Sequence, residues 1–356
     1  MDRAALIGQV RGNCNIADAR SWGYYSVCGL LLRLRDLYRF EHSLNPWDGV
    51  PMEAMSTWIA SKEKTWEQLA ASDLQPLDVC GTTYDPFQVD ELNSVLHAHG
   101  LVYGAGYGLF NKPTFFLAVL NDKRDLLDYQ VYHAGKELCR DLAAPIAMLQ
   151  GRCIFMRLEQ LTTFLWGKLQ ELQGKRFGGA LKMAFSLCGI EGAAWPSEEL
   201  QRKLNGLSTE IRDLIILHEV GEAFEDGQGY EWLSLLNQEW DRWTEFHLRG
   251  IKDLLADTSE FGPLKAIIHR RERSLLSFYV AFMDGIRKEL FPEMLTAFQL
   301  FSEQEDWSII EEARIRGYRK ADRLRSDILS LYSRDKETMK RHLEAAKEGA
   351  WQLSSS

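Results

Sequence analysis

Three consecutive helices expected in the second half of the chain carry apolar stripes that are interrupted by ionisable side chains. These side chains are His218, Glu222, His247 and Glu272. A buried charge is costly unless it is paired or ligated. Carboxylates and imidazoles that project inward from facing helices are the ligands of di-iron and di-manganese bundle proteins, and they suit iron or manganese. The pattern therefore predicts a redox-type iron or manganese site made by these four residues.

The same residues also have a purely structural interpretation. His218 and Glu222 stand four positions apart, so they can pair across one helical turn. His247 and Glu272 would then lie at the solvated edge of the helical seam. The Glu-x-x-His ligand pair typical of the bundle class is absent, since here the histidine comes first. The residue types alone leave both interpretations open.

The helices that must position these residues follow from apolar positions at helical spacing. In the second half they are expected near 178–189, 197–205, 209–226, 230–256, 263–290, 293–301, 305–333 and 335–350. A glycine-rich stretch around residue 175 marks the expected boundary between an N-terminal domain, 1–174, and a C-terminal helical domain, 175–356.

The N-terminal domain combines helical and strand-like patterns. Helices are expected near 18–42, with Asp18 as the N-cap, and near 51–72, 87–97, 140–150 and 153–173. Between them, alternating residues near 101–134 predict a small three-stranded antiparallel β-meander. The fold class is therefore mainly α, of the α+β type, followed by an all-α helical bundle domain.

Two groups of arginines are candidate binding surfaces. Arg33 and Arg35 lie on the first expected helix among tyrosines, where guanidinium groups can bind a carboxylate or phosphate. Arg316, Arg319 and Arg323 lie on the C-terminal helix and would meet an acidic partner, including a second copy of the chain. The alternative is that both groups pair with the chain's own acids or form a solvated helix surface.

The composition excludes several classes of protein. The 356 residues carry a formal net charge of −9, whereas nucleic-acid binding needs concentrated positive charge. The longest apolar runs are far shorter than the roughly 20 residues that span a membrane. Six cysteines without a CxxC pair, and an N-terminus without a continuous apolar region, indicate a cytoplasmic protein with reduced thiols.

A resemblance to a known family lies at the N-terminus. It is carried by Ala17-Asp18-Ala19-Arg20, Tyr25, Cys28, Leu31-Leu32-Arg33-Leu34-Arg35, Tyr38-Arg39 and Glu41. This stretch is similar to the opening of an uncharacterised family associated with anaerobic and sulfate-reducing bacteria. The resemblance implies a bacterial cytoplasmic protein and brings no activity, ligand or catalytic residue with it.

Two classes of function follow for this chain. It contains no phosphate-binding GxxxxGK[ST] loop and no GxSxG nucleophile elbow, which favours an interaction, regulatory or ligand-binding protein over an enzyme with a known motif. A small-ligand pocket beside the strands would be lined by Tyr103, Tyr107, Tyr129 and Arg35. The alternative class is a metal-binding helical-bundle enzyme that uses the histidine and carboxylate residues above.

Overall fold

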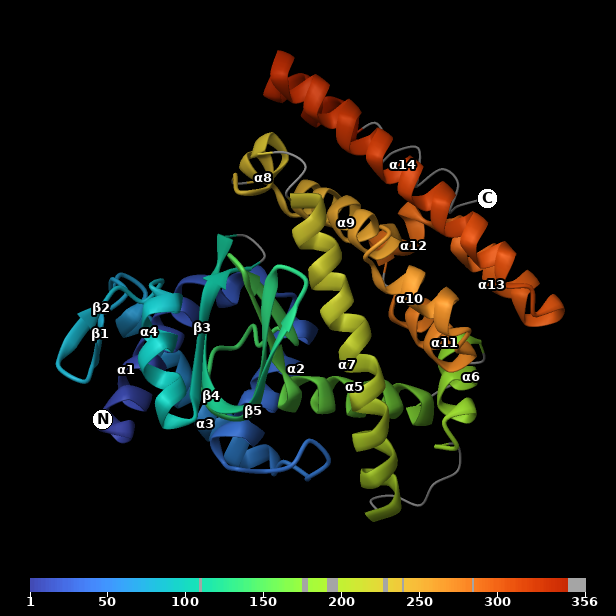
Figure 1. The fold of residues 1–356 in the computed structure, drawn as a ribbon. Coiled ribbons are helices and arrows are strands. Elements are labelled where there is room, and N and C mark those ends of the chain that lie inside the picture. The colour runs from blue at the N-terminus through green and yellow to red at the C-terminus, as the bar shows by residue number, and fades with distance from the viewer. Residues whose placement is uncertain are drawn as a thin grey trace. The chain divides into compact units, whose positions relative to one another are not determined.

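The chain folds into two compact units. The computed structural model describes residues 1–108, 111–174, 179–190, 198–226, 230–238, 240–283 and 285–344. The units are Met1–Gln170 and Glu171–Ser356. The first contains helices and small β-sheets, and the described part of the second is helical (Figure 1). The predicted class, mainly α with an α+β N-terminal part, is confirmed.

The helices of the N-terminal unit surround its strands. They are α1 (Arg3–Ser21), η1 (Trp22–Tyr24), α2 (Val27–Glu41), α3 (Met52–Leu69), α4 (Val89–Leu96), η2 (His97–His99) and α5 (Leu158–Gly174). The single helix predicted over 18–42 is wrong. Helix α1 begins after Asp2 and α2 after Ser26, and each of these side chains accepts hydrogen bonds from the amides of the following turn. Asp18 does not cap a helix, because it is buried near the end of α1.

The strands form a hairpin and a five-stranded sheet. The hairpin is β1 (Leu77–Val79) with β2 (Thr82–Tyr84), and the larger sheet has the order β3-β4-β5-β7-β6. Its strands are β3 (Leu101–Tyr107), β4 (Pro113–Leu126), β5 (Tyr129–Arg140), β6 (Ala147–Gln150) and β7 (Cys153–Arg157). The predicted antiparallel meander is confirmed as β3-β4-β5, and β7 extends it by pairing with β5 in parallel.

The helix predicted near 140–150 is wrong, and so is the first part of the one predicted over 153–173. Strands β6 and β7 occupy 147–150 and 153–157 instead. Every residue of β7 is buried, and its first four residues form an apolar run without the alternation that marks a half-exposed strand. Periodicity alone does not distinguish such a run from the start of a buried helix, and α5 begins only at Leu158.

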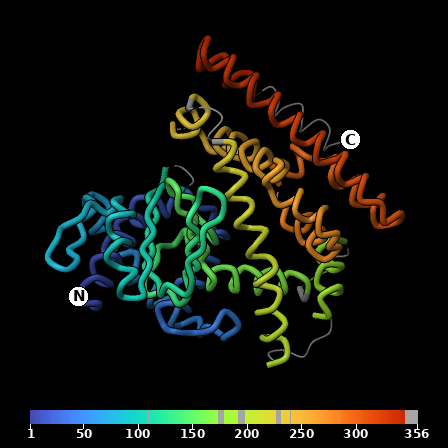
Figure 2. The backbone as a smooth tube through the Cα atoms, viewed as in Figure 1, coloured from blue at the N-terminus to red at the C-terminus, as the bar shows by residue number. Residues whose placement is uncertain are grey.

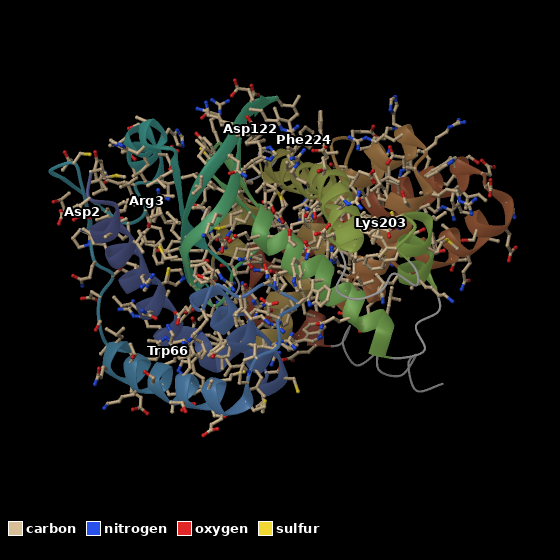
Figure 3. All side chains as sticks on the ribbon, turned by 90° about the horizontal axis from the view of Figure 1, so that it is seen from below. Asp2, Arg3, Trp66, Asp122, Lys203 and Phe224 are labelled. Atoms are coloured by element: carbon tan, nitrogen blue, oxygen red, sulfur yellow. The ribbon has the colours of Figure 1, made fainter. Side chains whose placement is uncertain are left out.

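The N-terminal unit has two apolar clusters. In the larger, α1 packs on β4 and β5 while α4 packs on β3, as Figure 1 shows. In the smaller, Trp66 of α3 is buried together with Leu34 and Leu37 of α2. Trp66 is labelled in Figure 3 on the helix that closes this side of the unit. The aromatic ring fixes α3 against α2 by the area that it buries.

The C-terminal unit is a set of packed helices. They include α6 (Ala180–Leu187), α7 (Glu198–Asp226), α8 (Tyr230–Leu236), α9 (Arg242–Thr258), α10 (Pro263–Arg270), α11 (Arg273–Phe282), α12 (Gly285–Leu290), α13 (Pro292–Gln304) and α14 (Trp307–Arg334). Residues 336–344, which follow α14, are also helical. Figure 2 shows α7 and α14 as long continuous coils. Helix α9 packs against α7, α12 and α14. None of the described helices is long and apolar enough to cross a membrane.

Several helix boundaries differ from those predicted. The segments 197–205 and 209–226 form one helix, α7, whereas the helix predicted over 230–256 is divided into α8 and α9. Asp241 starts α9 by accepting hydrogen bonds from two amides of its first turn. The helix predicted over 263–290 is divided into α10, α11 and α12, since Arg271 adopts a left-handed conformation (φ 54°) that ends α10.

Candidate metal centre

Helices α7 and α9 approach each other closely at one glycine. A Cβ atom built on Gly221 of α7 would lie 2.4 Å from the carbonyl oxygen of Ala256 on α9. This distance is far inside van der Waals contact, so only glycine permits the approach of the two backbones. His218 and Glu222 lie within one turn of Gly221 and are therefore brought next to the C-terminal half of α9.

Asp257 of α9 fixes the orientation of the His218 imidazole. Its Oδ1 atom lies 2.7 Å from His218 Nδ1, and its Oδ2 atom accepts a hydrogen bond of 3.1 Å from the Tyr279 hydroxyl. The Arg287 guanidinium lies 3.7 Å from the same Oδ2 atom. Because the Asp257 side chain is only 3% exposed, these partners hold it in one position. The other ring nitrogen, Nε2, then faces Glu222 Oε1 at 3.5 Å.

His218, Glu222 and Asp253 form a compact group of potential metal ligands. One ligand atom from each lies within 4.8 Å of the other two. All three side chains are partly buried, so the group is neither on the open surface nor sealed in the core. The second carboxylate oxygen of Glu222, Oε2, accepts a hydrogen bond of 2.8 Å from Lys252 Nζ.

The charges of the group perturb the pKa values of its two members on α7. Burial by itself would lower the pKa of His218, but Asp257 and Glu222 together raise it well above its ordinary value. Burial would raise the pKa of Glu222, but the Lys252 ammonium and His218 hold it well below its ordinary range. The two side chains therefore favour an ion pair when no metal is bound.

Two further carboxyl groups beside the pair have raised pKa values. The pKa of Asp253 is raised to about 6, mainly by burial and also by the negative charges of Glu222 and Asp257. The pKa of Glu219 is raised to about 7 by burial and by Glu222. Burial and the repulsion between neighbouring carboxylates thus oppose the ionisation of Asp253 and Glu219.

The structure brings together two of the four residues predicted as ligands. His218 and Glu222 are in the group, whereas His247 and Glu272 are not among the clustered ligand atoms of the described residues. His247 lies six residues before Asp253 on α9, which is about 9 Å along the helix axis. Glu272 occupies the N-cap position of α11 because α10 ends just before it.

Sequence reasoning missed Asp253 and Asp257. They stand four residues apart on α9, so they share one helix face in the same way as His218 and Glu222 on α7. Two such pairs, one on α7 and one on α9, are the signal that was available in the sequence. The sequence does not show which residues of α7 lie opposite which residues of α9, because this depends on the packing at Gly221.

His247 is a buried neutral side chain in the described structure. It is 8% exposed, and its ring stacks on Trp243 with centroids 4.9 Å apart. Its Nδ1 atom has no hydrogen-bond partner among the described residues. Burial lowers the pKa of His247 to about 4, so the imidazole is uncharged at neutral pH.

This burial predicts a loss of stability in acid. The unfolded chain binds a proton at His247 near pH 6.5, whereas the folded protein does so only near pH 4. The free energy of unfolding of the helical unit should therefore fall by about 2 kcal/mol from this group between pH 7 and pH 5. Urea denaturation at both pH values should show this loss reduced in His247→Phe and retained in the control, His269→Phe, whose side chain is exposed. An equal loss in wild type and His247→Phe would contradict the assignment.

The two predicted N-terminal arginines make contacts within their own unit. Arg33 donates a hydrogen bond of 2.7 Å to the carbonyl oxygen of Ala143 and lies 4.7 Å from the centroid of the Tyr25 ring. Arg35 lies 3.7 Å from Asp36. Only the Arg35 contact is the pairing with an acid that the structural alternative expects, whereas Arg33 contacts a backbone carbonyl and a tyrosine ring.

The predicted C-terminal arginines are placed differently. Arg316, Arg319 and Arg323 are all exposed on α14. Arg316 pairs with Glu312 one turn earlier, at 2.7 Å, and Arg323 donates to the backbone carbonyl of Arg319. Another arginine of α14, Arg325, contributes to packing through its bond of 2.9 Å to Glu225 of α7. The contacts of Arg316 and Arg323 thus lie within α14 itself.

Each of the two units matches a domain of a known protein family. An α+β unit is followed by a helical unit that carries a histidine–carboxylate cluster. Residues 5–157 match the N-terminal domain, and residues 162–350 the C-terminal domain, of the family of unknown function DUF6866. The chain therefore belongs to the DUF6866 family. No curated protein and no solved structure matches it.

Proposed function

We propose that the C-terminal unit binds one divalent metal ion through His218, Glu222 and Asp253. The observation that carries the proposal is the hydrogen bond between Asp257 and His218 Nδ1, at 2.7 Å. A metal-ligating histidine almost always binds a carboxylate or carbonyl through its other ring nitrogen, which fixes the tautomer and the ring orientation. Here that bond leaves Nε2 for the ion, on the side where Glu222 lies.

The distances within the group fit a single ion. Bonds of about 2.0–2.2 Å separate two ligand atoms on one ion by at most about 4.4 Å. The three ligand atoms lie within 4.8 Å of one another, so small side-chain rotations suffice to bring them onto one ion. The Lys252 ammonium donates a hydrogen bond to the Oε2 atom of Glu222, and Oε1 lies on the His218 side.

The donor set favours iron or manganese over softer metals. One imidazole and two carboxylates are hard or borderline ligands, and no thiolate belongs to the clustered group in the described residues. An ion with three protein ligands keeps positions for water or substrate and supplies Lewis-acid or redox chemistry. Glu219, with its pKa near 7, lies beside the site as a group able to accept or donate a proton.

The proposal is tested by metal binding with matched variants. Protein purified anaerobically without chelator should contain close to one iron or manganese ion per chain. After removal of the metal, calorimetric titration with Mn²⁺ should give one site. His218→Ala and Asp253→Asn should weaken this site by more than the roughly 10–100-fold typical of an outer-shell change. His269→Ala, an exposed histidine on α10, serves as the control. Failure of the wild-type protein to bind Mn²⁺, Fe²⁺ or Zn²⁺ would end the proposal.

Asp257→Asn tests the positioning role of the aspartate. The substitution keeps the size of the side chain but removes the negative charge that holds the His218 Nδ1 proton. We expect Mn²⁺ affinity to fall roughly 10–100-fold while the stoichiometry stays at one, because the three ligands remain. The control is Asp327→Asn, an exposed position on α14. Unchanged affinity in Asp257→Asn would show that the bond to His218 does not orient a ligand.

A second candidate function is partner binding through α14. The exposed row of Arg316, Arg319 and Arg323 supports it, and the partner that fits is an acidic protein surface, including a second copy of this chain. The complex or dimer should dissociate when the three arginines are replaced by glutamate and should weaken as salt is raised. Ultracentrifugation tests self-association directly. A complex unaffected by the triple substitution would exclude this surface.

We propose a cytoplasmic location in a bacterial cell. All six cysteines are free thiols, which is typical of a reducing compartment. The resemblance of the N-terminal segment to a bacterial family supports the same origin. Fractionation of the native host, followed by detection of the chain with an antibody, should place it in the soluble cytoplasmic fraction, and recovery in a periplasmic extract would contradict this.

A further inference from the structure

The N-terminal unit contains a second site, independent of the metal centre. It is a cavity of about 970 Å³ between the end of α2, the loop over 43–47, strands β4 and β5, and the first turns of α5. Its volume lies within the range of small-molecule sites, roughly 300–1,000 Å³. None of the residues expected from the sequence to line a ligand pocket, Tyr103, Tyr107, Tyr129 and Arg35, lines this cavity.

An irregularity of the sheet shapes one wall of the cavity. The pairing of β4 with β5 shifts its register three times between Leu117 and Asp122. At this point the Asn121 side chain lies against the backbone of Gly135, where a Cβ atom would be 2.1 Å from the amide oxygen. Both residues line the cavity. Bulges of this kind redirect side chains and are frequent next to binding sites.

Buried polar groups line the cavity close to this wall. Arg140, Glu137 and Gln160 are each at least nine-tenths buried and bond to one another. Arg140 also donates a hydrogen bond of 2.8 Å to the carbonyl oxygen of Asp36, but its Nε atom has no hydrogen-bond acceptor among the described residues. This Nε atom lies 3.7 Å from Glu137 Oε2, so the guanidinium is held in the wall of the cavity, where its positive charge favours an anion.

The charges that line the cavity leave a cationic excess. Most of them are paired: Lys62 with Glu41, Arg39 with Asp36, and Arg140 with Glu137. Three charged residues remain, namely Arg11, Lys136 and Glu159. Glu159 already accepts a hydrogen bond of 2.9 Å from the Glu137 amide. Arg11 and Lys136 have exposed side chains on α1 and β5, so both can turn towards a bound anion.

The cavity also has an apolar surface. Phe40 and Trp47 line it, and each ring is held by a neighbour. The guanidinium of Arg140 lies 5.0 Å from the centroid of the Phe40 ring, and Trp166 makes an edge contact with Trp47 at 5.8 Å. Fixed aromatic walls next to a few convergent polar groups are typical of ligand sites.

We propose that this cavity binds a small organic anion, with its charged group beside Arg11, Lys136 and Arg140 and its apolar body against Phe40 and Trp47. The anionic group is a carboxylate or a phosphate, since guanidinium and ammonium groups recognise both. The site does not depend on the metal centre, because every residue that forms it lies in the N-terminal unit.

Calorimetric titration of the full chain with three probes tests this site. The probes are phenyl phosphate, benzoate and benzamide, which share an aromatic ring and differ in charge. We expect one binding site for at least one of the two anions, with benzamide at least tenfold weaker. Tighter binding of phenyl phosphate identifies a phosphate monoester as the ligand class, and tighter binding of benzoate identifies a carboxylate.

Charge-reversal variants locate the site. Arg11→Glu and Lys136→Glu should each weaken binding of the anion at least tenfold, because each replaces a cation of the site with a negative charge. Lys64→Glu is the control, since Lys64 is exposed on α3 and does not line the cavity. The proposal is overturned if neither anion binds at millimolar concentration, or if both reversals leave the affinity unchanged. Because the substituted side chains are exposed, the fold should survive, and circular dichroism checks this.

Discussion

Lys112→Met should destabilise the N-terminal unit by about 3–5 kcal/mol. Lys112 Nζ lies 2.7 Å from Asp18 Oδ1, and the two side chains are only 5% and 2% exposed. Burial raises the pKa of Asp18 to about 6 although Lys112 opposes the shift. Without the ammonium, the buried aspartate would keep only its backbone partner, the amide of Leu142 at 3.0 Å. Urea denaturation, with hydrogen exchange of the β4 amides to locate the loss, measures the effect.

A double variant separates the lost pair from lost packing. Asp18→Asn combined with Lys112→Met removes both charges, so it should recover part of the stability that Lys112→Met loses. Lys64→Met, which replaces an exposed lysine of the same unit, should change stability by less than about 0.5 kcal/mol. A loss below about 1 kcal/mol in Lys112→Met would mean that the pair is not a buried structural bond.

Gly221→Ala should destabilise the C-terminal unit by about 3 kcal/mol and weaken metal binding. The added methyl group would meet the Ala256 carbonyl oxygen at 2.4 Å, and this neighbour is backbone, so the whole helix must move. His218 would then separate from Asp257, because these residues lie on the two helices that are pushed apart. Thermal unfolding and Mn²⁺ titration of the same variant measure the two effects.

Gly206→Ala is the matched control on the same helix. A Cβ atom at Gly206 has no heavy atom within 4 Å, so the substitution brings only the helix propensity of alanine. We expect it to stabilise α7 by about 0.5–1 kcal/mol and to leave Mn²⁺ affinity unchanged. If the two variants changed stability in the same direction, close packing at Gly221 would not be the cause.

The sequence predicted the presence of most helices and strands better than the residues at which they begin and end. The antiparallel meander and the helical second half followed from periods of two and 3.6 residues. The break between α1 and α2 was missed because Asp18 was assigned to a cap, whereas it is used in a buried ion pair with Lys112 at 2.7 Å. Lys112 lies 94 positions further along the chain, and no local pattern reports such a contact.

The candidate site was half predictable for a related reason. Helical periodicity indicates which face of a helix a residue occupies, and it placed His218 and Glu222 on the face of α7 that contacts α9. It does not indicate how far one helix is shifted along its axis relative to its neighbour. Packing at Gly221 puts His218 next to Asp257, nearly three helical turns beyond His247. His247 therefore lies on the same helix as Asp253 and Asp257 but outside the cluster of ligand atoms in the described residues.

The most direct test of the metal centre is pulsed electron paramagnetic resonance of the Mn²⁺-loaded protein. If His218 ligates the ion, the electron spin echo should be modulated by an imidazole nitrogen in wild type and in His247→Phe. The modulation should be absent from His218→Ala supplied with enough Mn²⁺ to occupy the weakened site. Nitrogen modulation that persists in His218→Ala, or that is absent from wild type, would contradict the assignment of His218, Glu222 and Asp253 as the metal site.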